Sequence, residues 1–387
     1  SKLKLKELVD ACHARNIKVI IDVVPNHVGD YIQGTGSDAH YVDYNSSMKT
    51  GTQVIPAAPF NDISWYHNNG DIDWTQEYPH TSSSTAMLED HDLGGLDDID
   101  FDNSSAKSTM INSIKYWFDY TGADAARVDA AKCMKPSDIH DLQTQLGVTT
   151  FGENFDMDVS FISDWVGDNA ENGMLDFPLF QSIVNDFAYG QNFDDTSTGT
   201  LSVKNVFDQD SYYGDHVNEM VTFIDNHDRN RFLTEAGGNV DKMQNALTFI
   251  FTCRGVPVVF QGTEQNKGNA NGQIISGIAD TWNRWSMVEK DANGNVICDY
   301  FNQNTNTYKL IADLNNLRSE NQALQTGTQR EMWASPSFYA FSRRVDSGEN
   351  MGQEVICAFS NSNNSQQITM PLRAESSLAV GTVLTNA

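Results

Sequence analysis

An arginine and an aspartate stand two residues apart in the stretch GADAARVDAAKCM, residues 122 to 134, at the end of a short apolar run. Alternate residues of a strand face the same side, so Arg127 and Asp129 should share one face. Two opposite charges beside an apolar core need a reason. They are either a buried structural pair or part of an active site.

Polar residues also follow the other runs that read as strands. Because the carboxyl ends of parallel strands meet on one face of a barrel, we expect these side chains to converge there. Asp22, inside the first run, we interpret as a structural partner within the barrel. The residues at the strand ends are Asn26, His27, Glu153, Asp225, Asn226, His227, Asp228, Gln261 and Glu264.

The inventory favours glycoside cleavage. The sequence contains no nucleophile elbow, phosphate loop or dinucleotide fingerprint, and several carboxylates remain. Such a reaction needs one ionised carboxylate and one protonated carboxylic acid. Arg127 would keep Asp129 ionised, because a neighbouring cation lowers the pKa of a carboxyl group. Glu153, after the apolar run TTF, is the candidate acid.

The apolar pattern predicts the scaffold for these residues. KVIIDVVPNH reads as a strand buried on both faces, and helix and strand then alternate through six units. Two of the predicted helices are SSAKSTMINSIKYWFDYTG, with a serine cap and a closing glycine, and PSDIHDLQTQLG. We therefore expect an α/β fold, a (β/α)8 TIM barrel whose first two strands are not in this chain. The predicted barrel residues are 1–27 and 103–320. Residues 28–102 would form an inserted, loop-rich domain. Residues 321–387 would form a C-terminal antiparallel β domain of the sandwich type, complete or truncated, whose strands are FYAFSRRV, EVICAFSN and QQITMPL.

Composition narrows the partners. The formal net charge of -27 disfavours nucleic acid and anionic membranes. No apolar run reaches the length of a membrane span. The five cysteines contain no CxxC pair, which argues against a zinc site or a dense disulfide framework. We expect a neutral or cationic small substrate, although the acidity could serve solubility alone.

With these motifs in place, the chain resembles the α-amylase family of glycoside hydrolases. DVVPNH, ARVDAAK, FGEN and FIDNHD resemble its four signatures in order, and LDDID, residues 96 to 100, resembles the signature that ends its inserted domain. Details such as QGTEQ and DTWNR are most similar to bacterial amylases related to cyclodextrin glucanotransferases. The resemblance covers nearly the whole chain.

The resemblance implies roles for individual residues. Asp129 would be the nucleophile, Glu153 the acid/base and Asp228 the third carboxylate. A structural calcium would lie between barrel and insertion, an ion that prefers oxygen ligands. Its implied ligands are Asn26, Asp98 and the carbonyl of Cys133. The implied substrate-binding residues are His27, Arg127, Lys132, His227, Asp280 and Arg284; Phe155 is a candidate for stacking on a sugar or, equally, a core residue.

Three departures from the family pattern bear on specificity. The strand that carries the family's stacking tyrosine lies upstream of Ser1, Cys133 replaces a histidine, and Gly94 stands where cyclising enzymes carry a bulky aromatic. The expected function is endo-acting, retaining hydrolysis of α-1,4-glucosidic bonds in an α-glucan by a secreted monomer. The alternatives are a cyclodextrin glucanotransferase or maltogenic transglycosylase, and a non-catalytic glucan-binding protein, although all three carboxylates are present.

Overall fold

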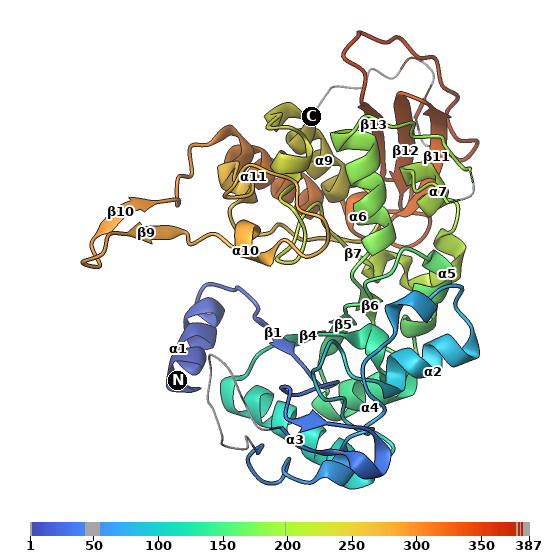
Figure 1. Cartoon of the computed structure of the whole chain (residues 1–387). Helices are drawn as coiled ribbons and strands as arrows, with labels where there is room; N and C mark the ends of the chain where they lie inside the picture. Colours follow the sequence, from blue (N-terminus) through green and yellow to red (C-terminus); the bar gives the residue numbers. More distant parts are fainter. Residues whose placement is uncertain (1, 43–54, 198, 377, 380, 382–387) are drawn as a thin grey trace. The chain divides into compact units, whose positions relative to one another are not determined.

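The computed structural model describes residues 2–42, 55–197, 199–376, 378–379 and 381. The chain divides into two compact units, residues 1–175 and 176–387, and each is described by itself (Figure 1). The predicted insertion lies within the first unit, and the predicted C-terminal β domain lies within the second.

A four-stranded parallel sheet in the order β1-β4-β5-β6 carries the first unit. In its register Asp22 lies beside Arg127, and Arg127 beside Phe151. The strands are β1 (Ile20–Val23), β4 (Ala125–Val128), β5 (Thr149–Gly152) and β6 (Gly173–Met174). The long helices are α1 (Lys2–His13), α3 (Ser104–Thr121) and α4 (Pro136–Leu146), and α5 (Val159–Ile162) follows β5.

Helix α3 shows how local sequence sets these elements. Asn103, not a serine as we expected, caps its first turn by accepting hydrogen bonds from the amides of Ser105 and Ala106. Gly122 ends it in the left-handed conformation (φ 77°), where glycine has no steric penalty. Its apolar face is buried, and α3 packs against α1 and α4.

Strand β1 differs from its prediction. Among the described residues it pairs with β4 alone, at the end of the sheet. Ile20 is 52% exposed and Val24 is 41% exposed, so burial on both faces is not observed. An aliphatic run is buried only where neighbouring elements cover both of its faces, and the described residues of this unit do not cover them.

The insertion is built from short elements. They are β2 (Ile32–Gln33), β3 (His40–Tyr41), α2 (Ser82–Asp90) and the 3-10 turns Gly36–Asp38, Ile63–Trp65 and Trp74–Gln76. The LDDID segment joins them to the end of β1: the amide of Ile99 donates to the carbonyl of Asn26 (2.8 Å), and the amide of His67 to the carbonyl of Asp98 (3.2 Å). This places two sequence motifs side by side.

The second unit begins with a parallel strand pair and a set of helices. The strands are β7 (Val221–Thr222) and β8 (Val256–Pro257), and the helices are α6 (Phe177–Ile183), α7 (Val203–Phe207), α8 (Phe232–Glu235), α9 (Val240–Thr252), α10 (Asp280–Asn283), α11 (Asn306–Glu320) and α12 (Gln322–Thr326). The α6 helix continues as a π-helical turn over Val184–Ala188. Phenylalanines from α9 and from the antiparallel sheet described next form much of the core of the second unit.

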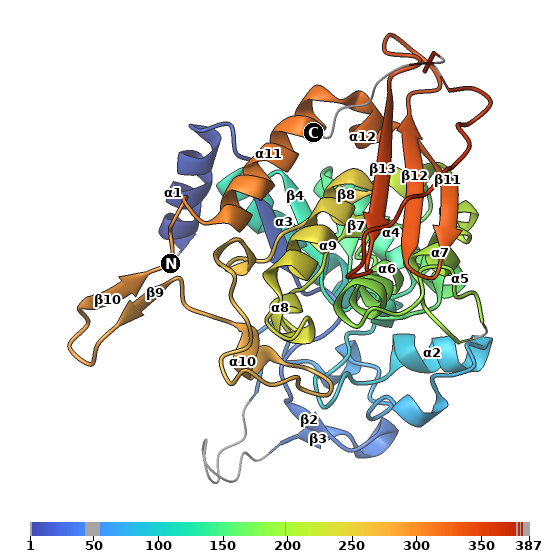
Figure 2. The same ribbon diagram turned by 90° about the horizontal axis from the view of Figure 1, so that it is seen from above.

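An antiparallel sheet, β11-β12-β13, closes the second unit, and Figure 2 shows its three strands side by side. It comprises β11 (Thr328–Ser335), β12 (Phe338–Arg344) and β13 (Glu354–Ser360). Strands β12 and β13 confirm the predicted strands FYAFSRRV and EVICAFSN. QQITMPL, residues 366 to 372, was predicted as a third strand and is not one, whereas Thr328–Ser335 was not predicted and pairs with β12. Alternation alone does not make a strand without a partner ladder.

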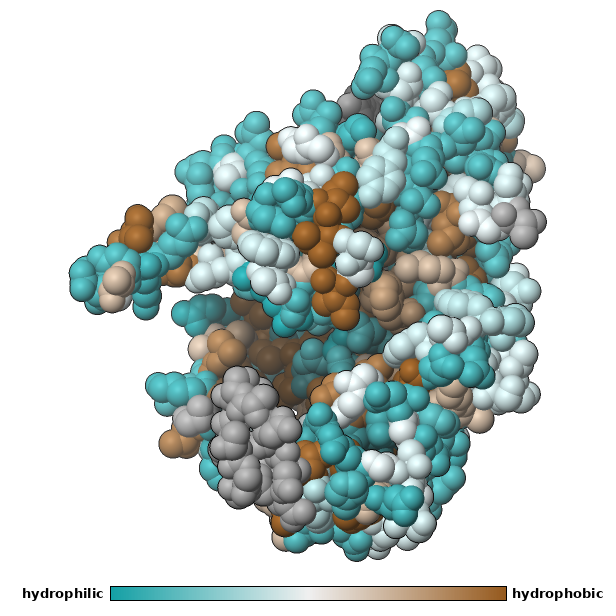
Figure 3. Space-filling view, viewed as in Figure 1, coloured by the Kyte–Doolittle hydropathy of each residue, from teal (hydrophilic) through white to brown (hydrophobic). Residues whose placement is uncertain are grey.

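A second antiparallel pair, β9 (Val288–Lys290) and β10 (Val296–Asp299), forms a hairpin that carries apolar side chains on its surface (Figure 3). Ile297 is 67% exposed. Among the described residues, every helix is too short or too polar to pass through a bilayer.

Candidate active site

Arg127 is the hub of the charged residues in the first unit. Its Nη1 lies 2.5 Å from Asp129 Oδ1 and 2.8 Å from Asp22 Oδ1, and its Nη2 lies 2.8 Å from Glu153 Oε2. Burial opposes its charge, but the carboxylates of Glu153, Asp22 and Asp129 together raise the pKa of Arg127. The guanidinium is therefore a permanent cation between two catalytic candidates.

This geometry bears on the question raised by the stretch 122–134. Asp22 contacts Arg127, in agreement with its interpretation as a structural partner. Arg127 contacts Asp129 as the prediction requires, and it contacts Glu153 as well, which was not predicted. The forked guanidinium binds two carboxylates at once, so it does not by itself decide which of the two carries the proton.

His27 lies at the end of β1 beside the same carboxylates. Its Nε2 is 3.9 Å from Asp129 Oδ2, and its Nδ1 is 3.0 Å from Asn26 Oδ1. Burial lowers the pKa of His27, against the charge of Asp129. A neutral imidazole with its Nε2 toward Asp129 suits a hydrogen bond to a sugar hydroxyl.

Asn26, Asp98 and the carbonyl of Cys133 come together, as the resemblance implies for a calcium site. Asn26 Nδ2 lies 2.5 Å from Asp98 Oδ1 and 2.8 Å from the Cys133 carbonyl oxygen. All three residues line a cavity of about 10 Å³, together with Glu89 and Asp138, which is room for one water or ion. Asn26 and Asp98 are almost fully buried.

The donor set fits a calcium ion. Burial raises the pKa of Asp98 to about 7, against the opposing effect of its hydrogen bond with His67. A carboxylate so deeply buried needs a compensating charge. A half-turn of the Asn26 amide, whose nitrogen and oxygen are hard to distinguish, would present a third oxygen. The described residues contain no group of three or more histidine, cysteine or acidic side chains that could hold a metal ion, so the implied site depends on an amide and a backbone carbonyl beside Asp98.

The thiol of Cys133 is buried. Burial raises the pKa of Cys133 to about 12, which favours a neutral thiol over a nucleophilic thiolate. The implied role of its backbone carbonyl as a calcium ligand stays a prediction.

Two residues implied to touch sugar lie close together in the first unit. Phe155 follows β5 and is 42% exposed, which favours a contact surface over a core position. Lys132 is buried instead, and its ammonium contacts Glu77, the Phe155 carbonyl oxygen (3.1 Å) and Asp156 Oδ2 (2.7 Å).

The second unit carries its own group of implied site residues, on the loop after β7 and on α10. Arg284 Nη2 lies 3.0 Å from Asp228 Oδ1 and 3.8 Å from Asp280 Oδ2, and Arg284 Nε donates to the His227 carbonyl (3.1 Å). His227 Nε2 is 3.3 Å from Asp228 Oδ2. The four residues predicted from FIDNHD and DTWNR therefore belong to one cluster.

The loop that holds Asp228 is shaped by Asn226. Its Oδ1 accepts hydrogen bonds from the amides of Asp228 (3.0 Å) and Arg229 (2.9 Å). Asp225, in contrast, is fully buried and bonds the Thr263 hydroxyl and the Phe232 amide. Of the two aspartates in DNHD, the second is the accessible one.

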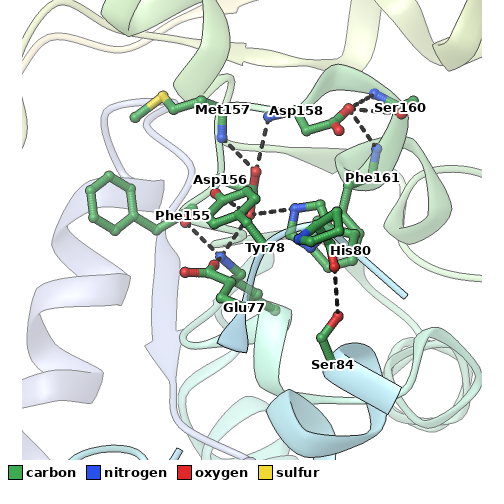
Figure 4. Close-up of polar contacts among 12 residues, drawn as sticks. Glu77, Tyr78, His80, Ser84, Phe155, Asp156, Met157, Asp158, Ser160 and Phe161 are labelled. Atoms are coloured by element: carbon green, nitrogen blue, oxygen red, sulfur yellow. Dashed lines mark hydrogen bonds and ion pairs between the residues drawn. The ribbon is translucent and has the colours of Figure 1, made fainter. Parts of the chain in front are cut away.

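Sequence reasoning missed a polar cluster around Asp156, shown in Figure 4. It combines Glu77, Tyr78 and His80 of the insertion with the loop after β5. The available signal was Asp156 itself, a carboxylate three residues after Glu153. The insertion residues carry no periodic pattern that could have pointed to it.

The parallel strands and the carboxylates at their ends match one known protein family. The family model for the α-amylase catalytic domain matches residues 1–295. The chain belongs to the α-amylase family, whose fold is the predicted (β/α)8 barrel with a C-terminal β domain. Six of its parallel strands, β1 and β4–β8, are among the described residues.

Relatives carry several activities in their names. The chain is 34% identical to a "Beta/alpha-amylase" of Paenibacillus polymyxa over 99% of this chain and 28% of that protein. It is 29% identical to a cyclomaltodextrin glucanotransferase of Thermoanaerobacterium thermosulfurigenes (91% and 44%) and 29% to an α-amylase of Niallia circulans (90% and 60%). The chain thus spans only part of each relative.

A solved structure agrees in fold. The crystal structure of CldA, a cyclomaltodextrin glucanotransferase with a three-domain ABC distribution, superposes with a TM-score of 0.70 at 26% identity. The match covers 93% of this chain and 67% of that one.

Proposed function

We propose that this protein hydrolyses internal α-1,4-glucosidic bonds of starch-like glucans with retention of anomeric configuration. The observation that supports this most is the bridging of Asp129 and Glu153 by one guanidinium. Retaining enzymes hold their two carboxyl groups only about 5–5.5 Å apart, whereas inverting enzymes need room for a water between them. Two carboxylates on the same guanidinium suit the shorter spacing.

In the first step Asp129 attacks the anomeric carbon while Glu153 protonates the leaving oxygen. This step requires one proton on the pair, carried by Glu153, and one negative charge, carried by Asp129. The accessible carboxylate of the second unit, Asp228, would bind sugar hydroxyls together with Arg284. His27 would donate to a hydroxyl of the cleaved sugar.

In the second step the role of Arg127 changes. Once Asp129 is an ester it has lost its charge, and Glu153 remains the charged partner of Arg127 nearest the chemistry. The cation then favours ionised Glu153, which is the form that can take a proton from the attacking water. Contact with both carboxylates thus supports the switch from acid to base.

The proposal includes one calcium ion held by Asn26, Asp98 and the Cys133 carbonyl. When bound, it would clamp the insertion to the end of β1, since its ligands come from both segments. We further propose that the enzyme acts on polymeric glucan outside the cell, because a polymer of that size does not cross a membrane.

Hydrolysis is preferred over cyclisation because of Gly94. Its φ is +60°, and a Cβ at this position would meet no atom within 4 Å. A glucan chain has no side chain there to wrap around. The alternative, a glucanotransferase, is favoured by the names of several relatives.

Product analysis on soluble starch tests the proposal. We expect linear maltooligosaccharides of mixed length to appear early, and Asp129→Asn and Glu153→Gln to abolish turnover. Cyclodextrins as the main early product would establish the transferase instead. Binding without turnover in the wild type would establish the non-catalytic alternative.

A further inference from the structure

The carboxylate of Asp156 has no exposed surface and lies three residues after Glu153. Its Oδ1 accepts hydrogen bonds from the amides of Met157 (2.7 Å) and Asp158 (2.9 Å). A carboxylate that is buried so completely requires partners for both oxygens. The local backbone supplies the partners of only one.

The second oxygen of Asp156 is bound by residues from elsewhere in the first unit. Oδ2 lies 2.7 Å from Lys132 Nζ, accepts from the Tyr78 hydroxyl (2.9 Å), and lies 3.2 Å from His80 Nε2 (Figure 4). The His80 ring is itself held by stacking on Phe161, with centroids 3.6 Å apart and planes 6° apart. Tyr78 and His80 belong to the insertion, so Asp156 connects the insertion to the loop of the acid.

Lys132 completes this connection, and all three hydrogens of its ammonium group are engaged in it. An ammonium group has three hydrogens, and Lys132 places them on Glu77, Asp156 and the Phe155 carbonyl. Its backbone amide also donates to the Glu153 carbonyl (3.2 Å). One residue therefore contacts the backbone of the acid/base itself and the chain two and three residues after it, and its ammonium has no hydrogen left for a sugar.

Electrostatics keep this cluster assembled. Burial alone would raise the pKa of Asp156, but the charge and hydrogen bond of Lys132 and the Asp158 amide lower it overall. Asp156 is therefore an anion at neutral pH and holds the Lys132 cation in place. A pair so deeply buried is costly to break from one side, because the partner is left as an uncompensated charge.

We propose that Asp156 is a positioning residue for Glu153 and that it acts through Lys132. Lys132 connects the insertion to the loop that follows Glu153 and is not a sugar ligand. The inference rests on the proposed function. It makes the placement of the acid depend on Glu77, Tyr78 and His80, so the insertion contributes to proton transfer without touching the substrate.

The test compares Asp156→Asn with a matched variant, Asp124→Asn. Asp124 also accepts a backbone hydrogen bond, from Val19 (2.7 Å), and contacts a histidine, His13, but lies just before β4, at the opposite end of the sheet. Both variants lose a charged acceptor in a segment that flanks this sheet. Each is assayed on a maltooligosaccharide and on a maltooligoside with a nitrophenyl leaving group, which needs little protonation.

We expect Asp156→Asn to lower kcat on the maltooligosaccharide by about 10- to 100-fold, with KM changed less than about threefold, because a misplaced acid loses proton transfer and not binding. On the nitrophenyl substrate kcat/KM, which reports the first step alone, should fall by less than about threefold, because that leaving group needs little protonation. Asp124→Asn should change kcat by less than about twofold on both the maltooligosaccharide and the nitrophenyl substrate.

Tyr78→Phe removes a single hydroxyl from the cluster and serves where Asp156→Asn does not fold. It should reproduce the same selective loss at about three- to tenfold, and in the double variant the two losses should not multiply, because both act through one carboxylate.

A rise in KM with kcat unchanged would overturn the proposal and restore Lys132 to sugar binding. An equal fall in kcat/KM on both substrates would also overturn the proposal. So would a fall in kcat of the same size in Asp124→Asn. If the wild type itself fails to cleave α-glucan while remaining folded, the proposed function fails and this inference fails with it. That result differs from the kinetic outcomes above, in which the wild type is active and only the variants decide.

Discussion

Arg127 Nη2 lies 2.8 Å from Glu153 Oε2, a contact that the spacing of the sequence did not predict. The two residues face each other from neighbouring parallel strands, β4 and the end of β5. The guanidinium therefore serves the nucleophile and the acid/base together.

Replacing Arg127 by lysine tests that double contact. Lysine keeps the charge but has a compact ammonium that cannot hold two carboxylates in a fixed fork. We expect kcat to fall by about 100-fold or more, because both reacting groups lose their alignment. Asp22→Asn is the control: Asp22 contacts the same guanidinium from a side chain that is 57% exposed, so its loss should cost less than about threefold. Equal losses in the two variants would contradict the assignment.

The calcium proposal predicts a selective response to chelation. A ligand that binds only the folded protein stabilises it, so chelator should lower the melting temperature of the wild type by about 5 °C or more. Asp98→Ala should have a lower melting temperature than the wild type, and chelator should not lower it further. Asp124→Asn, outside the cavity, should keep the full response. A wild-type melt unchanged by chelator, with no metal by elemental analysis, would reject the ion.

Gly94 offers a test of hydrolysis against transfer. The space at its Cβ is open, so Gly94→Tyr can place a ring there, although the positive φ makes the change mildly destabilising. We expect the ratio of transfer to hydrolysis to rise by about twofold or more, since the ring gives the glucan a surface and slows water. Gly94→Ala introduces the same backbone strain without a ring, and it should leave the ratio unchanged. If Gly94→Tyr leaves the ratio of transfer to hydrolysis unchanged, position 94 does not determine the choice between the two reactions.

Asp186, in the π-helical turn of the second unit, should make stability depend on pH. Burial raises the pKa of Asp186 to about 8, while the unfolded chain titrates near 3.8. Between these values the unfolded state has released a proton that the folded state keeps, so stability falls as pH rises. Asp186→Asn removes this loss and should raise the melting temperature by about 5 °C or more at pH 8 and little at pH 5.

A control with the opposite environment sharpens that measurement. Asp62 is an exposed aspartate whose pKa is lowered by hydrogen bonds from Ser64. Asp62→Asn should shift the melting temperature by the same small amount at pH 5 and pH 8. An Asp186→Asn curve that runs parallel to the wild type across this range would show that the carboxyl group is ionised in the fold.

Sequence predicted the elements whose signals are local. Helix α3 and helix α4 have their periodic apolar faces and terminal glycines within one stretch of chain, and both were predicted. Residues 366–372 alternate just as β12 does and yet form no strand, because a strand also requires a neighbour that the alternation does not specify.

The same distinction applies to the site. Arg127, Asp129 and Glu153 were found because they follow apolar strands whose ends must meet. The Asp156 cluster was not, since Tyr78 and His80 lie in a segment without periodicity and more than 70 residues away in sequence. The contact of Arg127 with Glu153 could not be predicted either, because two-residue alternation describes one strand and not the pairing between strands.

The anomeric configuration of the first product tests the central claim most directly. Wild-type enzyme is mixed with a maltooligosaccharide, and the new reducing ends are followed by proton NMR before they mutarotate. Two displacements at one carbon, first by Asp129 and then by water, predict that the α-anomer appears first and the β-anomer only later by mutarotation. Initial release of the β-anomer would mean a single displacement by water, and it would contradict the roles assigned to Asp129 and Glu153.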